Sequence, residues 1–225
     1  SKGVLLMPSF AIGRTQEIVY ELNRLLTAGT IPHVPLYLDS PMAQKASDIY
    51  RAYLDYFDDD ARAIVAGGDP GIDYPDAIVA NSAKESLAIE QAARPFMVVA
   101  SNGMITGGRI VQHVKSLIGD PGMTLLFVGY QGQGTLGAQL QQGAKKVRMD
   151  GQDLEVHCQV RSISGFSAHA DEPELLAWLG NFTKKPRTTF IVHGDPAAQA
   201  AFEPKVRALG FATGVPAWRE TVELA

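Results

Sequence analysis

The stretch "KGVLLMPSFAIGRTQEIVYELNRLLTAGTIPHVPLYLDSP", residues 2–41, joins two short apolar runs through one amphipathic segment. Val4–Met7 predicts a strand, and Leu36–Leu38 predicts a second one. Between them, one helical face carries five apolar side chains: Ile18, Val19, Leu22, Leu25 and Leu26. Thr15 is expected to cap this helix and Gly29 to end it. A strand, a helix and a second strand in this order predict a unit of parallel sheet.

The same alternation continues toward the middle of the chain. Further segments are an amphipathic stretch at 42–57, a short run at 77–80, a helix near 82–92, a strand at 96–100, a helix near 109–118 and a strand at 124–128. The sequence therefore predicts an α/β fold, with a mostly parallel sheet flanked by helices.

The pattern changes after Gly143. "KKVRMDGQDLEVHCQVRSI", residues 145–163, alternates apolar and polar residues around Asp150-Gly151, which predicts a β-hairpin. We therefore expect a domain boundary near residue 145, with one domain at 1–145 and a second at 146–225. Within the second, Asp171, Pro173 and Glu174 predict the start of a helix before Leu175–Leu179.

Composition excludes several classes of protein. The chain has 225 residues and is 46% hydrophobic, as expected for a globular protein with a real core. The single Cys158 excludes an internal disulfide framework, and neither a leader nor a long apolar span is present, so we expect a cytoplasmic protein without a membrane segment. A net charge of -4 argues against broad binding of nucleic acid but allows a local basic groove.

Two glycine-rich loops each follow a predicted strand and precede a predicted helix. In "VVASNGMITGGRIVQHV", residues 98–114, the candidate phosphate contacts are Ser101, Asn102, Gly103, Gly107 and Gly108. In "FVGYQGQGTLGAQL", residues 127–140, they are Gly129, Gly132 and Gly134. Tight turns without a ligand are the alternative, since short glycine motifs are weak signals. Because both loops leave carboxyl ends of one sheet, we expect them to converge.

Two of the five histidines occupy matched positions. His169 lies in "ISGFSAHADEPELLAWL", residues 163–179, and His193 lies in "TTFIVHGDPAAQ", residues 188–199. Each follows a strand-like run among small residues and precedes an acid, so we expect the rings to be neighbours at adjacent strand ends. A buried structural role is the alternative, but an imidazole there can bind a metal or act as a general acid. We interpret His33, His113 and His157 as structural.

Two acidic features receive a structural interpretation. Asp39 ends a strand in "YLDSPMA", where a catalytic role is conceivable, but we expect it to cap the following helix with the help of Ser40 and Pro41. "DYFDDDAR", residues 55–62, is interpreted as a solvated loop because it lacks the spacing of a metal-binding loop.

Six motifs in order resemble the β-CASP branch of the metallo-β-lactamase superfamily, RNA-processing nucleases of the ribonuclease J and mRNA 3'-end cleavage type: "MPSFAIGRTQE", "YLDSPMA", "ASNGMITGG", "VGYQGQGTLG", "GFSAHAD" and "IVHGD". The resemblance implies a zinc-dependent ribonuclease. Residues 1–145 would form the β-CASP domain, and 146–225 the C-terminal part of a metallo-β-lactamase αββα domain. It also implies that catalytic His169 lies by the scissile phosphate, and that Ser167 is a further contact to the RNA phosphates. Catalytic His193 would bind zinc, and a histidine there favours RNA over DNA.

Two departures from the family limit what the resemblance implies. Asn102 replaces the more usual serine, and the H-x-H-x-D-H ligands are absent from residues 1–225. We therefore expect a fragment that is inactive alone and needs a missing N-terminal half to hold two zinc ions. Alternatives are a non-catalytic RNA-binding or assembly module, and a hydrolase of small esters or thioesters, which the long insertion disfavours. A homodimer is left open.

Overall fold

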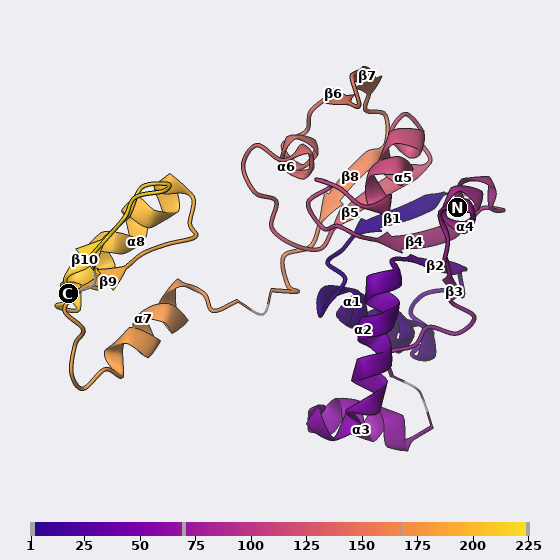
Figure 1. Cartoon of the computed structure of the whole chain (residues 1–225). Helices are drawn as coiled ribbons and strands as arrows, with labels where there is room; N and C mark the ends of the chain where they lie inside the picture. The colour runs from indigo at the N-terminus through magenta and orange to yellow at the C-terminus, as the bar shows by residue number, and fades with distance from the viewer. Residues whose placement is uncertain (1–2, 69–70, 168, 224–225) are drawn as a thin grey trace. The chain divides into compact units, whose positions relative to one another are not determined.

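The computed structural model describes residues 3–68, 71–167 and 169–223 (Figure 1). Its contacts divide the chain into two compact units, Ser1–Ser167 and Ala168–Ala225, which are described separately. The first unit therefore includes the hairpin and extends past residue 145, where the sequence predicts a boundary between domains.

A six-stranded parallel sheet forms the centre of the first unit. Its order is β3-β2-β4-β1-β5-β8, and every pairing in it is parallel. The strands are β1 (Val4–Pro8), β2 (Leu36–Asp39), β3 (Ile78–Val79), β4 (Phe96–Ala100), β5 (Met123–Phe127) and β8 (Gln159–Ser162). The predicted α/β class with a mostly parallel sheet is confirmed.

Helices cover both faces of this sheet, as Figure 1 shows for α1 and α5. Because neighbouring residues of a strand point to opposite faces, Leu6 packs with α5 while Met7 packs with α1. The helices of this unit are α1 (Arg14–Thr27), α2 (Pro41–Ala52), α3 (Asp59–Ala66), α4 (Ala83–Ala88), α5 (Arg109–Leu117) and α6 (Leu136–Gln141), with short 3₁₀ turns at Leu54–Tyr56 and Ile89–Gln91.

The start of α1 differs from the prediction. Gly13, not Thr15, is the N-cap, and no side chain caps this end. Thr15 instead lies inside the first turn, where its hydroxyl donates to the Phe10 carbonyl at 2.8 Å. The predicted end is confirmed, because Gly29 follows the helix with a left-handed φ of 67°.

Two predictions about acidic residues need correction. Ser40, not Asp39, caps α2 by accepting from the Ala43 N–H at 3.2 Å, because the side chain of Asp39 is directed into the protein interior. Residues 55–62 are mostly exposed to solvent, as predicted, but they are not a loop, because they contain part of a 3₁₀ turn and the start of α3. Asp58 accepts from the Ala61 N–H at 2.8 Å and starts α3, whose first turn places carboxylates near the positive end of the helix.

The predicted hairpin is present as β6 (Lys146–Met149) and β7 (Gln152–Glu155), paired antiparallel. Asp150 and Gly151 make its turn with φ values of 48° and 78°, the left-handed pair that a two-residue hairpin requires.

The second unit contains α7 (Glu172–Gly180), β9 (Thr189–Phe190), α8 (Pro196–Ala208) and β10 (Thr213–Gly214). The predicted helix start is confirmed, because Asp171 and Glu174 form a reciprocal capping box at α7. Leu179, Val206 and Phe211 make up its small core. Among the described residues of the whole chain, no helix is long and apolar enough to cross a bilayer.

Candidate nucleic-acid interface

Three loops meet at the carboxyl edge of the parallel sheet. They follow β1, β4 and β5, and β1 lies between the other two strands. The chain leaves β1 toward β2 but leaves β5 toward β8, so the connections diverge at the β1–β5 pair. Open α/β sheets bind ligands at such divergence points, at the carboxyl ends of the strands.

Asn102 organises the loop between β4 and α5 from within. Its Oδ1 accepts from the N–H groups of Met104 at 3.3 Å and Thr106 at 3.0 Å. Its Nδ2 donates to the Thr106 hydroxyl at 3.0 Å. A serine side chain is too short to make this set of contacts, so the departure from the family motif has a structural role. Direct phosphate contact by Asn102 stays a prediction.

Packing explains two glycines of the same loop. Gly108 has a φ of 79°, and a Cβ there would lie 2.3 Å from the Ser101 carbonyl oxygen, which accepts from the Ile110 N–H. Gly103 is buried, and its Cβ would lie 2.9 Å from a ring carbon of Phe10. Gly108 is therefore required for the loop to close, whereas a side chain at Gly103 would displace the Phe10 ring, in both cases independently of any ligand.

The start of α5 offers donors to an anion. Among the residues that the structure describes, none accepts a hydrogen bond from the N–H groups of Gly107 and Gly108. Gly108 is exposed and directly precedes the helix. Free N–H groups at the positive end of a helix suit a phosphate.

The loop between β5 and α6 is hydrogen-bonded to the first loop, so the predicted convergence is confirmed. The Gln131 amide is buried and donates to the Gly103 carbonyl at 2.9 Å. Thr135 caps α6 through the Ala138 N–H at 3.1 Å. The space around Gly129 and Gly134 is open, because a Cβ at either position meets no atom within 4 Å.

Two exposed aromatic side chains flank these loops, and the sequence reasoning missed both. Phe10 follows β1 and is 47% exposed, and Tyr130 follows β5 and is 63% exposed. Gln131 was also missed. The available signal for the two aromatic residues was their position within three residues of a strand end, beside a glycine-rich segment.

A buried polar cluster lies below the first loop. The Asp39 carboxylate is fully buried and receives hydrogen bonds from Arg109 Nη1 at 2.6 Å and the Ser86 hydroxyl. His113 Nε2 lies 2.7 Å from Oδ2, the same carboxylate oxygen that accepts from Ser86. Arg109 also donates to the Ala80 carbonyl at 2.8 Å. Nη1 of the guanidinium at the start of α5 therefore holds two elements of the fold together.

The pKa of Asp39 reflects these contacts. Burial by itself raises it, but hydrogen bonds from His113, Ser86 and Arg109 outweigh burial and hold the pKa below its usual value. On the far side of the imidazole, His113 Nδ1 lies 3.9 Å from Glu90 Oε1, and neither atom has a hydrogen-bond partner within the described part of the chain. The structural interpretation of His113 is confirmed by its complete burial.

The remaining histidines have different surroundings. His33 stacks on Tyr74 at 5.8 Å between ring centroids, and His157 is exposed beyond β7. His169 is exposed and lies two residues before the Asp171 cap of α7. His193 is exposed between β9 and α8 with a left-handed φ of 61°, which is uncommon for a residue other than glycine and often marks a functional position.

The strands before the two candidate histidines belong to different sheets. β8, before His169, pairs with β5, whereas β9, before His193, pairs with β10. Because these strands belong to different compact units, the proximity of His169 and His193 stays a prediction. Ser167 is the last residue of the first unit, and Ala168, between it and His169, lies outside the described residues.

The residues that the structure describes do not form a complete metal site. In the described ranges, no group of three or more His, Cys, Asp or Glu side chains could hold a metal ion. His193 is a single candidate ligand, whereas a catalytic zinc takes three protein ligands and an open position.

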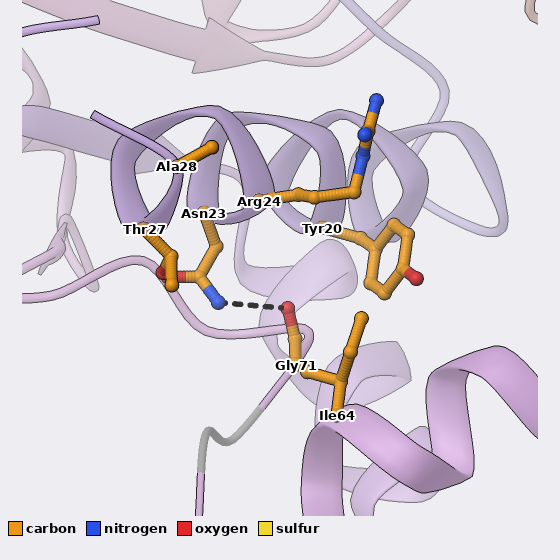
Figure 2. Close-up of a pocket in the computed structure, with 7 residues that line it drawn as sticks. All are labelled: Tyr20, Asn23, Arg24, Thr27, Ala28, Ile64 and Gly71. Atoms are coloured by element: carbon orange, nitrogen blue, oxygen red, sulfur yellow. Dashed lines mark hydrogen bonds between the residues drawn. The ribbon is translucent and has the colours of Figure 1, made fainter. Parts of the chain in front are cut away.

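A cavity of about 260 Å³ lies apart from the glycine loops, between α1 and α3 (Figure 2). Its lining residues are Tyr20, Asn23, Arg24, Thr27, Ala28, Ile64 and Gly71. Asn23 Nδ2 donates to the Gly71 carbonyl at 3.5 Å across it. None of the predicted site residues lines this cavity.

Comparison with known families gives two matches along the chain. The Beta-Casp domain matches residues 15–140, and the Zn-dependent metallo-hydrolase RNA specificity domain matches residues 153–216. The chain belongs to the β-CASP family. The β-CASP match contains both glycine-rich loops and the Asp39 cluster, and the second match contains His169 and His193.

Relatives of this β-CASP chain are longer proteins. Ribonuclease TTHA0252 of Thermus thermophilus is 38% identical over 209 residues, which cover 92% of this chain and 45% of the relative. Transcription termination factor FttA of Pyrococcus abyssi is 34% identical over 230 residues, 99% of this chain and 35% of the relative. The chain thus spans less than half the length of these relatives and matches their C-terminal part.

Replacing Asp39 by Asn is expected to lower the free energy of unfolding by about 3 kcal/mol at pH 7, because Arg109 loses its buried partner. The difference in the free energy of unfolding between the wild type and this variant should shrink in acid. A carboxylate with a depressed folded pKa stabilises the fold above its unfolded value, near 3.9, and this stabilisation is lost as the pH falls through the folded value. Urea titrations at pH 7 and pH 3 measure both effects.

The control is Asp153→Asn, at an exposed ion pair of the hairpin, which should cost less than about 1 kcal/mol. If both variants lost the same free energy of unfolding, the stabilising role of Asp39 would be contradicted.

Gly108→Ala is expected to lower stability by about 1–3 kcal/mol, because the new Cβ meets backbone atoms at a left-handed position. Gly129→Ala, in open space of the neighbouring loop, should change stability by less than about 1 kcal/mol. Thermal unfolding followed by circular dichroism compares them. Similar melting temperatures would show that Gly108 is not required by packing.

Proposed function

We propose that this chain is the RNA-recognising part of a zinc-dependent ribonuclease that hydrolyses RNA phosphodiester bonds in the cytoplasm. The observation that carries the proposal is the carboxyl edge of the sheet. There, two glycine-rich loops are hydrogen-bonded together, and the N–H groups of Gly107 and Gly108 have no partner among the described residues. The matched RNA specificity domain and the ribonuclease relative support RNA as the ligand.

In this proposal, backbone groups hold the RNA chain. The N–H groups of Gly107 and Gly108 donate to a phosphate, while the open space at Gly129 and Gly134 lets the backbone approach closely. The remaining proposed contacts to RNA are Ser101, Asn102, Gly103, Gly132 and Ser167. Backbone contacts of this kind position a nucleic acid without reading its sequence.

The two candidate histidines carry the proposed chemistry. His169 contacts the scissile phosphate or protonates the leaving oxygen, and His193 is a zinc ligand. Because the described residues lack a complete ligand set, cleavage is proposed only for an enzyme in which an N-terminal metallo-β-lactamase half adds the other ligands. The β-CASP domain is proposed to span 1–145 and the C-terminal metallo-β-lactamase segment 146–225.

A non-catalytic RNA-binding module is the second candidate. It is favoured by a loop edge that is well formed beside an incomplete set of metal ligands in the described chain. The two candidates share RNA binding and differ in whether zinc-dependent cleavage appears in the longer protein.

The chain is expected to bind single-stranded RNA with an affinity that falls as salt rises, since phosphate contacts release counterions. Gly107→Glu and Gly129→Glu should each weaken binding by about fivefold or more at low salt, because a carboxylate then faces the phosphates. Fluorescence anisotropy with a labelled oligouridylate measures the affinities.

Gly119→Glu is the matched control, because it adds the same charge between α5 and β5, at the opposite edge of the sheet. Salt-independent binding, or equal losses in all three variants, would count against the proposed interface.

Cleavage is expected to need more than this chain. The 225 residues alone should neither retain stoichiometric zinc nor cut RNA, whereas the full reading frame that contains them should do both. Within the longer protein, His193→Ala should lower zinc content, and His169→Ala should lower the rate by about 10²- to 10⁴-fold with zinc retained. Zinc analysis and a gel assay on labelled RNA give both readouts. Zinc-dependent cleavage by the 225-residue chain would refute the division of ligands.

A further inference from the structure

Phe10 and Tyr130 present aromatic rings at the same edge as the glycine-rich loops. They follow β1 and β5, which are neighbouring parallel strands in the register Leu6 to Leu125. Phe10 lies two residues after the end of β1 and Tyr130 three residues after the end of β5. Both residues therefore lie in loops at the carboxyl edge of the sheet, beside the glycine-rich segments.

The position of Phe10 is held by its own backbone and by the first loop. The Phe10 carbonyl accepts from the Thr15 N–H at 3.2 Å and from the Thr15 hydroxyl at 2.8 Å. One part of the ring covers Gly103, where a Cβ would come within 2.9 Å of it. The rest stays open to solvent, with 47% of the residue exposed. This side chain is therefore fixed by packing on one side and available on the other.

Tyr130 is placed by the residue that follows it. Gln131 is buried, and its amide donates to the Gly103 carbonyl at 2.9 Å and to the Gly129 carbonyl at 3.3 Å. The backbone on both sides of Tyr130 is thus tied to the loop that supports Phe10. The tyrosine itself is 63% exposed.

We propose that Phe10 and Tyr130 stack on bases of single-stranded RNA whose phosphates lie on the glycine-rich loops. This inference rests on the proposed RNA-binding function and names the side chains that contact the bases. Aromatic rings beside a phosphate-binding surface form the usual platform for unpaired bases, and stacking tolerates any sequence because every base has a π-face. If the two rings bound a protein, this would not explain why backbone N–H groups that suit a phosphate lie at the same edge.

The test separates base contacts from phosphate contacts. The 225-residue chain is titrated with a short oligouridylate and with an abasic oligomer of the same length, which keeps every phosphate but lacks the bases. The wild-type chain is expected to prefer the oligouridylate by roughly 5- to 100-fold. Tyr130→Leu and Phe10→Leu should lose most of this preference and retain the wild-type affinity for the abasic oligomer.

Two further variants control the experiment. Tyr130→Phe keeps the ring and should keep the preference for bases. Tyr56→Leu removes a tyrosine that is 86% exposed after the far end of α2, and it should behave as wild type. Because Phe10 packs on Gly103, replacing it could destabilise the fold, so the melting temperature of Phe10→Leu is measured as well. If Phe10→Leu is unstable, the conclusion is drawn from Tyr130→Leu alone.

Each outcome decides one proposal. Leucine variants that keep the full preference for bases overturn the stacking proposal, and so does a wild-type chain that binds both oligomers equally. If the rings instead bind a protein, the leucine variants would keep the full preference for bases. A wild-type chain that binds neither oligomer contradicts the proposed function itself, so the two failures are distinguishable.

Discussion

The buried carboxylate of Asp39 is the interaction on which the loop edge depends. It ends β2, receives a hydrogen bond from Ser86 of α4, and contacts Arg109 and His113 of α5. Because Arg109 is the first residue of α5, this ion pair sets where the helix begins and therefore where Gly107 and Gly108 lie. A buried charge costs free energy unless it is paired, so the cluster persists only in one arrangement of these elements.

From that anchor, contacts extend across the edge of the sheet. The glycine-rich loop above Arg109 closes only because Gly108 leaves room for the Ser101 carbonyl. Gln131 joins the neighbouring loop to Gly103, and the ring of Phe10 packs on the same glycine. Glycine therefore serves two purposes here. Gly103 and Gly108 allow close packing, whereas Gly129 and Gly134 leave open space for the proposed RNA chain.

Family membership and the local structure together explain why a protein with a net charge of -4 is proposed to bind RNA. The proposed contacts are backbone N–H groups and aromatic rings, which need no excess of lysine and arginine. Arg109, the cation nearest the first loop in sequence, is used by the fold. The proposed interface would hold the phosphate chain and stack its bases without reading their order.

The sequence by itself determined the local elements, because hydrophobic periodicity and capping residues act over a few positions. The α/β class, the hairpin at Asp150-Gly151 and the capping box at Asp171 were all predicted on that basis. Only the tertiary structure decided the partners of Asp39, which come from 47 to 74 residues further along the chain, and the pairing of β8 with β5. Such contacts depend on packing between distant segments, which leaves no local pattern, so a carboxylate that resembled a helix cap proved to be the centre of a buried cluster.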